Sequence, residues 1–175
     1  MRKKRALPSV PGLSADSARF MADLQKETDR GVALVGAAFL DEALEAMLRA
    51  FFADDSNCAD SLLGTDRPLG TFSARTRAAR CLGLLGPNMH CDLNTIRDIR
   101  NYFAHCHRQV SFDSPEVQGL CGSIKTGNSI ATLMELRMSP RFRFILAVVL
   151  LTQQLLIRGL SLKHLATGKD FTGSG

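Results

Sequence analysis

The amino-acid sequence predicts an all-α protein, a single helical bundle of about five to six helices, on three observations. No stretch alternates between apolar and polar residues over the length of a strand, so no β structure is expected. Apolar residues instead recur at helical spacing in segments that Gly and Pro separate. The 175-residue chain is 45% hydrophobic and 22% charged, with a mean hydropathy near zero, which suits one domain with an ordinary core.

The chain is expected to have three parts. Residues 1–13 are basic and then contain two prolines, and we expect them to form a disordered tail. The bundle is expected to span residues 14–166, and residues 167–175 are expected to form a flexible tail. The N-terminal segment lacks the apolar run of a secretory signal, and five cysteines without CxxC spacing favour a reducing compartment, so a cytoplasmic location is expected.

The first two helices follow from a cap and from the apolar pattern. Ser14 is a suitable N-cap for a helix that runs to about Thr28. A longer helix over about 29–52 is apolar nearly all round in its first half and amphipathic in its second, which predicts the central helix of the bundle. Residues 53–70 carry Asp, Ser, Asn, two Gly and a Pro, which predicts a connecting loop with one turn over 59–63.

The third and fourth helices carry much of the positive charge. Thr71 or Ser73 caps a third helix to about residue 85, where a Gly-Pro pair ends it, and Asn88 caps a fourth helix through about residue 106. The helical period gives the fourth helix an apolar side, expected in the core, and a polar, cationic side. The apolar side comprises Met89, Ile96, Ile99 and Phe103. The cationic side comprises Arg97, Arg100, Asn101, Ala104, His105 and Arg108.

Two further helices complete the predicted bundle. Ser114, followed by Pro and Glu, opens a short fifth helix that three glycines weaken. A last helix begins near Pro140 and carries the most apolar segment of the chain, Phe144–Leu151. This segment is well short of the roughly 20 residues needed to cross a bilayer, so we expect a buried helix and no membrane contact.

The net charge of +5 is concentrated in the N-terminal tail and in a basic segment over 66–108, where seven arginines and three aspartates give +4. Arginine suits contacts to phosphate and carboxylate groups, so a binding role is predicted for four arginines, with a solvated surface as the alternative. They are Arg75, Arg97, Arg100 and Arg108. A helix-turn-helix is not favoured, because the arginines of the fourth helix lie away from the end that usually enters the DNA groove.

The segment from Arg100 to His105 suggests a second kind of chemistry. An Arg five positions before a His suits RNA cleavage, with His105 as general acid or base and Arg100 stabilising charge on the phosphate. Five helical residues place the two side chains about 140° apart, so two copies across a two-fold axis are needed to aim both at one phosphate. The alternative is structural: Asn101 and His105 satisfy buried polar groups, and Arg100 pairs with an acid.

No metal and no cofactor are expected. Several His and Cys residues are suitable ligand types, but they lack the spacing of a zinc finger or of a metalloprotease helix. They are His90, Cys91, His105, Cys106 and His107. The glycines match neither a Walker loop nor a dinucleotide-binding fingerprint.

Three segments together resemble the mannitol operon repressor family. They are residues 29–44, the turn Pro-Leu-Gly-x-x-Ser-x-Arg over 68–75, and residues 93–105, which end in Ile-Arg-Asn-x-x-Ala-His. The resemblance covers roughly residues 29–112 and implies an all-helical, cytoplasmic bacterial regulator of transcription without a recognisable DNA-binding motif.

The segment 100–105 also resembles the Arg-x4-His motif of HEPN domains, helical bundles that dimerise and in many cases cleave RNA without metal. By this resemblance Arg100 and His105 would be catalytic, and Asn101 would position them. Two functions of different class are therefore predicted. The first, which the family resemblance favours, is a non-enzymatic regulator that binds a partner protein or nucleic acid and forms a homodimer through the face of its fourth helix. The alternative is a metal-independent endoribonuclease with its site at the dimer interface.

Overall fold

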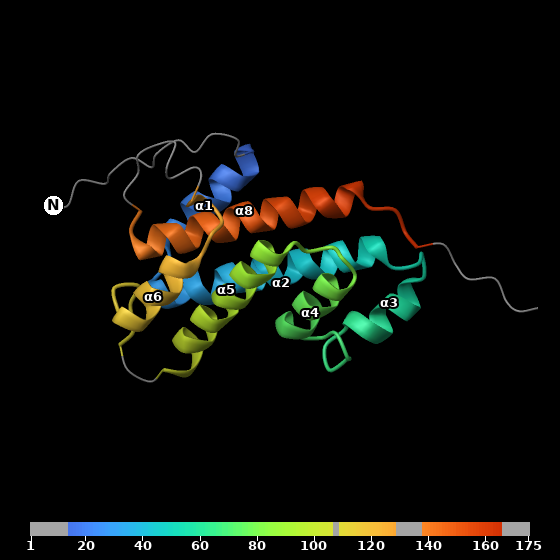
Figure 1. The fold of residues 1–175 in the computed structure, drawn as a ribbon, viewed down its shortest axis with the longest axis horizontal. Helices are drawn as coiled ribbons and strands as arrows, with labels where there is room; N and C mark the ends of the chain where they lie inside the picture. Colours follow the sequence, from blue (N-terminus) through green and yellow to red (C-terminus); the bar gives the residue numbers. More distant parts are fainter. Residues whose placement is uncertain (1–13, 107–108, 129–137, 166–175) are drawn as a thin grey trace, which may run out of the picture.

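The computed structural model describes residues 14–106, 109–128 and 138–165, and the regular elements in these ranges are all α-helices. The helices are α1 (Ala15–Lys26), α2 (Asp29–Phe51), α3 (Ser56–Leu63), α4 (Phe72–Cys81), α5 (Pro87–His105), α6 (Pro115–Ser123) and α8 (Pro140–Ser161). They form a helical bundle (Figure 1), so the all-α prediction is confirmed. The tails expected over 1–13 and 167–175 lie outside the described residues.

Helices α2 and α8 form the centre of the bundle, where they lie side by side (Figure 1). Helix α2 also packs against α1, α4 and α5, and α8 also packs against α1, α5 and α6. The two central helices approach closely at Gly36, where an added Cβ would lie 3.2 Å from Val148 and 3.3 Å from Phe144. The prediction of a central helix over 29–52 is confirmed.

Helix α8 is long and apolar enough to cross a membrane by length and composition alone. Its apolar residues have another explanation, because residues 144–149, Leu151 and Leu155 are buried in the bundle. This burial confirms the prediction that the segment Phe144–Leu151 lies in a buried part of the last helix.

Side-chain caps set several helix starts. Ser14, Thr28 and Thr71 each accept a hydrogen bond from the backbone N–H three residues later. The predicted caps Ser14 and Thr71 are thereby confirmed. The prediction that Asn88 caps the next helix is wrong: Gly86 is the N-cap of α5, and Pro87 is its first residue, because the fixed φ of proline suits that position.

Two elements between α2 and α5 differ from the sequence-based expectation. Asp55 accepts a hydrogen bond from the Cys58 N–H at 3.0 Å and starts α3, a helix of eight residues where one turn was expected. Helix α4 ends at Cys81 rather than near residue 85. The cause is Gly83, which has a φ of +73° and leaves the helix in the left-handed conformation that glycine tolerates.

Candidate functional site

Arg75, one of the four predicted binding arginines, lies buried near the start of α4 and is 7% exposed. Its guanidinium forms ion pairs with Asp41 and Glu45 of α2, each at 2.7 Å. It also donates a hydrogen bond of 2.8 Å to the carbonyl oxygen of Leu63, the last residue of α3. Arg75 therefore connects α4 to α2 and α3, and two carboxylates balance its charge.

The carboxylates that hold Arg75 belong to a larger charged network. Glu45 also pairs with Arg49 of α2 at 2.9 Å, and Arg49 pairs with Asp60 of α3 at 2.7 Å. Hydrogen bonds to Asp60 and Glu45 raise the pKa of Arg49. The network fixes α3 and α4 on one side of α2 and so positions the loop between them.

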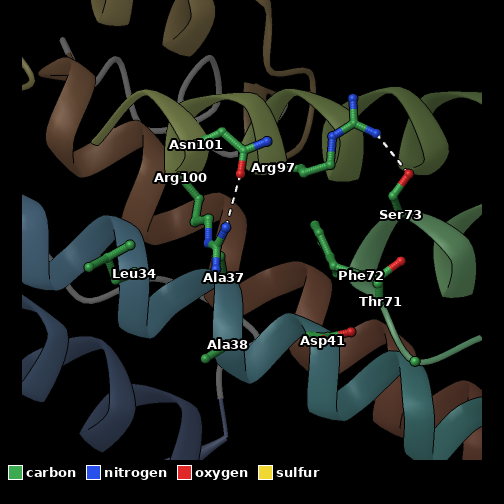
Figure 2. Close-up of a pocket in the computed structure, with 11 residues that line it drawn as sticks. Leu34, Ala37, Ala38, Asp41, Thr71, Phe72, Ser73, Arg97, Arg100 and Asn101 are labelled. Carbon is green, nitrogen blue, oxygen red and sulfur yellow. Dashed lines mark hydrogen bonds between the residues drawn. The ribbon is translucent and has the colours of Figure 1, made fainter. Parts of the chain in front are cut away.

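That loop and three helices enclose a pocket of about 460 Å³ (Figure 2). Helix α2 forms its floor, α5 its opposite wall and the start of α4 its end. The lining residues are Leu34, Ala37, Ala38, Asp41, Gly70, Thr71, Phe72, Ser73, Arg97, Arg100 and Asn101. The alanines of α2 leave the space open, and α5 and the start of α4 supply most of the polar groups.

Gly70 brings the start of α4 to the pocket by a close backbone approach. A Cβ at this position would lie 2.6 Å from the carbonyl oxygen of Gly64 and 3.1 Å from that of Arg67. The segment Pro-Leu-Gly noted in the sequence therefore packs the loop tightly enough to place Thr71 as the cap of α4.

Two arginines of α5 line the pocket, and each is held by a neighbour. Arg100 is exposed and donates to Asn101 Oδ1 at 3.0 Å (Figure 2). Arg97 donates to Ser73 Oγ at 3.2 Å and pairs with Asp98 at 2.9 Å. Among the described residues, Arg100 has no carboxylate within ion-pair distance, so its positive charge faces solvent and the pocket.

The structure brings together only part of the predicted catalytic set. Arg100 and Asn101 line the pocket, whereas His105 is exposed at the last turn of α5 and is not among the lining residues. Arg108 lies outside the described residues. An Arg100–His105 site formed across two copies stays a prediction.

No protein-family model and no curated protein matches the sequence. The solved structures that match it in fold include the following two. MtlR in the MtlR–HPr complex from Escherichia coli has a TM-score of 0.66 and 18% identity, and the match covers 82% of this chain and 99% of that chain. A possible transcriptional regulator, YggD from Shigella flexneri, has a TM-score of 0.61 and 14% identity over 89% of this chain and 100% of its own. The chain shares the helical-bundle fold of these two structures.

This shared fold agrees with the all-helical fold that the sequence resemblance implies. Within the described ranges, no group of three His, Cys, Asp or Glu side chains is placed to hold a metal ion. Cys58, Cys81 and Cys91 are exposed, and Cys121 is buried. Burial raises the pKa of the Cys121 thiol to about 12, so this thiol is protonated at neutral pH.

Sequence reasoning missed a second surface feature of the helical bundle. Large apolar side chains are exposed on α2 and α8, and α1 adds Phe20, whose ring lies 4.3 Å from that of Phe39. We call this group the α1–α2–α8 apolar surface; it comprises Phe20, Phe39, Leu156, Ile157 and Leu160. The signal was present in the sequence, because the last helix stays apolar beyond the eight residues expected to be buried.

Proposed function

We propose that this protein is a non-enzymatic regulator of the mannitol operon repressor type that acts by binding a partner protein through the surface of α4 and α5. The observation that carries the proposal is the fold shared with MtlR over 99% of the MtlR chain, because that MtlR was solved in complex with a protein, HPr. A bundle with this fold is thus able to bind a partner protein.

The charges on α4 and α5 support the choice of surface. Arg77 of α4 and Arg100 of α5 are exposed, and neither has an ion-pair partner among the described residues. Unpaired surface arginines are suited to pairing with carboxylates on a partner, which favours fast and specific association. Arg75, by contrast, is buried and forms ion pairs with Asp41 and Glu45, so it is not available to a partner protein.

DNA reading by α5 has less support than protein binding. The N-terminal half of α5 begins Pro-Asn-Met-His-Cys, and Asp92 and Leu93 of its next turn are buried. The arginines of α5 lie in its C-terminal half. A recognition helix normally presents its N-terminal residues to base edges, so this helix is poorly suited to enter a major groove.

Titration calorimetry of the full chain with Escherichia coli HPr tests the proposal. We expect saturable binding that weakens by roughly tenfold or more in the charge-reversal variants Arg77→Glu and Arg100→Glu. Arg158→Glu is the matched control, because Arg158 is exposed on α8 and the same charge change there is expected to leave the affinity unchanged.

Three results would contradict the proposal. The first is the absence of HPr binding together with salt-dependent DNA binding that the Arg100 variant loses, which would indicate a nucleic-acid binder. The second is HPr binding that tolerates both charge reversals, which would place the contact on another surface. The third is RNA cleavage in the presence of a chelator that His105→Ala abolishes, which would indicate the endoribonuclease.

A further inference from the structure

The pocket between α2, α4 and α5 has most of its hydrogen-bond acceptors already engaged. Asn101 Oδ1 accepts from Arg100 at 3.0 Å, and Ser73 Oγ accepts from Arg97 at 3.2 Å. Thr71 Oγ1 accepts from the backbone N–H of Ala74 at 3.2 Å. The polar groups that remain available around the pocket are therefore mainly donors.

These donors come from two directions. On α5, the amide nitrogen of Asn101 is directed away from Arg100 (Figure 2), and Arg100 uses one of its five N–H groups on Asn101. On α4, the backbone N–H groups of Phe72 and Ser73 precede the first intrahelical bonds, and no acceptor for them occurs among the described hydrogen bonds. Hydroxyl hydrogens of Thr71 and Ser73 add to this set.

One carboxylate, that of Asp41, lines the pocket, and Arg75, which also pairs with Glu45, compensates part of its negative charge. Arg75 lies 2.7 Å from Asp41 Oδ1 behind the pocket wall. On the opposite wall, Asp98 balances Arg97, which leaves Arg100 as the lining cation without a carboxylate among the described residues. The excess of hydrogen-bond donors and the positive charge of Arg100 both favour the binding of an anion that has several acceptor oxygens.

The rest of the pocket lining is apolar and is suited to contact the carbon skeleton of an organic molecule. Leu34, Ala37, Ala38 and Phe72 supply an apolar floor beside the polar wall. The volume of about 460 Å³ lies in the range of small-molecule sites and exceeds the space that a bare inorganic ion fills.

We propose that this pocket binds a phosphate monoester. The phosphate group accepts from Arg100, Asn101 and the first N–H groups of α4, and the organic part lies on the alanines of α2. A phosphate is preferred to a carboxylate because its three terminal oxygens are able to meet donors from two helices, including a helix N-terminus. The phosphate belongs either to a free small molecule or to a modified side chain of another protein. The inference does not rest on the proposed HPr contact, because it is tested on the protein alone.

Calorimetry at constant ionic strength tests the pocket with defined probes. They are inorganic phosphate, glycerol 3-phosphate, a phosphoserine peptide, glycerate as the carboxylate analogue, and glycerol. We expect saturable binding of the phosphate esters that is at least tenfold tighter than that of glycerate, and no binding of glycerol. In nuclear magnetic resonance spectra, the amide signals of Phe72 and Ser73 are expected to shift with the same saturation curve.

Two variants, at Arg100 and Ala38, test whether the ligand binds in this pocket. Both residues are exposed, so their substitution is expected to leave the core intact. Arg100→Gln removes the unbalanced cation, and Ala38→Leu fills the floor without changing charge. Each is expected to weaken phosphate-ester binding at least tenfold, with unchanged circular dichroism and Tm, whereas Arg158→Gln on α8 is expected to bind like the wild type.

The outcomes separate the two sources of phosphate. Tighter binding of glycerol 3-phosphate supports a free small-molecule ligand, and tighter binding of the phosphoserine peptide supports a modified side chain. The proposal is overturned if no phosphate ester binds above the ionic-strength control, if glycerate binds equally well, or if both variants retain full affinity. Loss of HPr binding alone bears on the proposed function and leaves these results unaffected.

Discussion

Arg75 lies among groups from three helices, and its contacts determine how α3 and α4 sit on α2. Two carboxylates at 2.7 Å and one carbonyl oxygen at 2.8 Å surround its guanidinium. Removing the guanidinium would leave the partly buried Asp41 without a counter-charge and Glu45 with Arg49 alone, a situation that costs several kcal/mol in folded proteins.

We therefore expect Arg75→Met to lower the free energy of unfolding by about 3 kcal/mol, measured by urea denaturation. Arg77→Met is the matched control, because Arg77 is an exposed arginine on the same helix and its loss is expected to cost less than about 0.5 kcal/mol. Equal stabilities of the two variants would contradict the structural role of Arg75.

Cys121 gives a second prediction at the residue scale. Its pKa is raised to about 12 because burial disfavours the thiolate, so the reactive form is scarce at any pH well below 12. We expect iodoacetamide at pH 8 to modify the exposed Cys58, Cys81 and Cys91 and to spare Cys121 until urea unfolds the protein, as measured by peptide mass spectrometry. Rapid labelling of Cys121 in the native protein would contradict this burial.

At the scale of elements, α5 makes two sets of contacts. Arg97, Arg100 and Asn101 line the pocket, and Asp92 is buried. The Asp92 carboxylate accepts from the backbone N–H groups of Lys125 at 3.0 Å and Thr126 at 2.7 Å, and from Thr126 Oγ1 at 2.6 Å. Asp92 thereby attaches the segment that follows α6 to α5.

Substitution of Asp92 by Ala should leave those two backbone N–H groups without their acceptor. We expect the free energy of unfolding to fall by about 2 kcal/mol, with faster hydrogen exchange at Lys125 and Thr126. Asp98→Ala, on the exposed side of the same helix, is expected to change stability by less than about 1 kcal/mol. Unchanged exchange at Lys125 in the Asp92 variant would show that other contacts hold the segment.

The contacts of α5 also show which features of the structure can be predicted from the sequence. Helical periodicity correctly grouped Ile96, Ile99 and Phe103 on the core side, because that grouping depends only on local geometry. Periodicity gave no sign that Arg75 meets Asp41 or that Asp92 meets Thr126. Such contacts join residues that are distant in the chain, so they depend on how the helices pack.

At the scale of the whole molecule, the α1–α2–α8 apolar surface is the largest departure from a polar exterior. Leu160 is 89% exposed, and Ile157 and Leu156 lie on the same helix at 57% and 48%. Apolar surface of this kind is typical of protein contacts, because association removes it from water. The sequence placed a homodimer contact on the fourth predicted helix, which is α5, but the exposed apolar side chains lie elsewhere.

The homodimer stays a prediction, and its contact is now expected on the α1–α2–α8 apolar surface. Sedimentation velocity is expected to give twice the 19.1 kDa mass of one chain, in low and in high salt, because apolar contacts are not screened. Ile157→Asp is expected to give the mass of one chain. The mass of one chain for the unmodified protein at all concentrations would contradict the dimer.

The central claim, that α4 and α5 dock a partner protein, is tested most directly by mapping the contact on the isotope-labelled chain. Nuclear magnetic resonance spectra recorded during a titration with Escherichia coli HPr report which backbone amides change their surroundings. We expect the saturating changes to fall on α4 and the C-terminal half of α5, around Arg77 and Arg100, with the C-terminal half of α8 unaffected. Spectra that do not change, or changes confined to α8, would contradict the account.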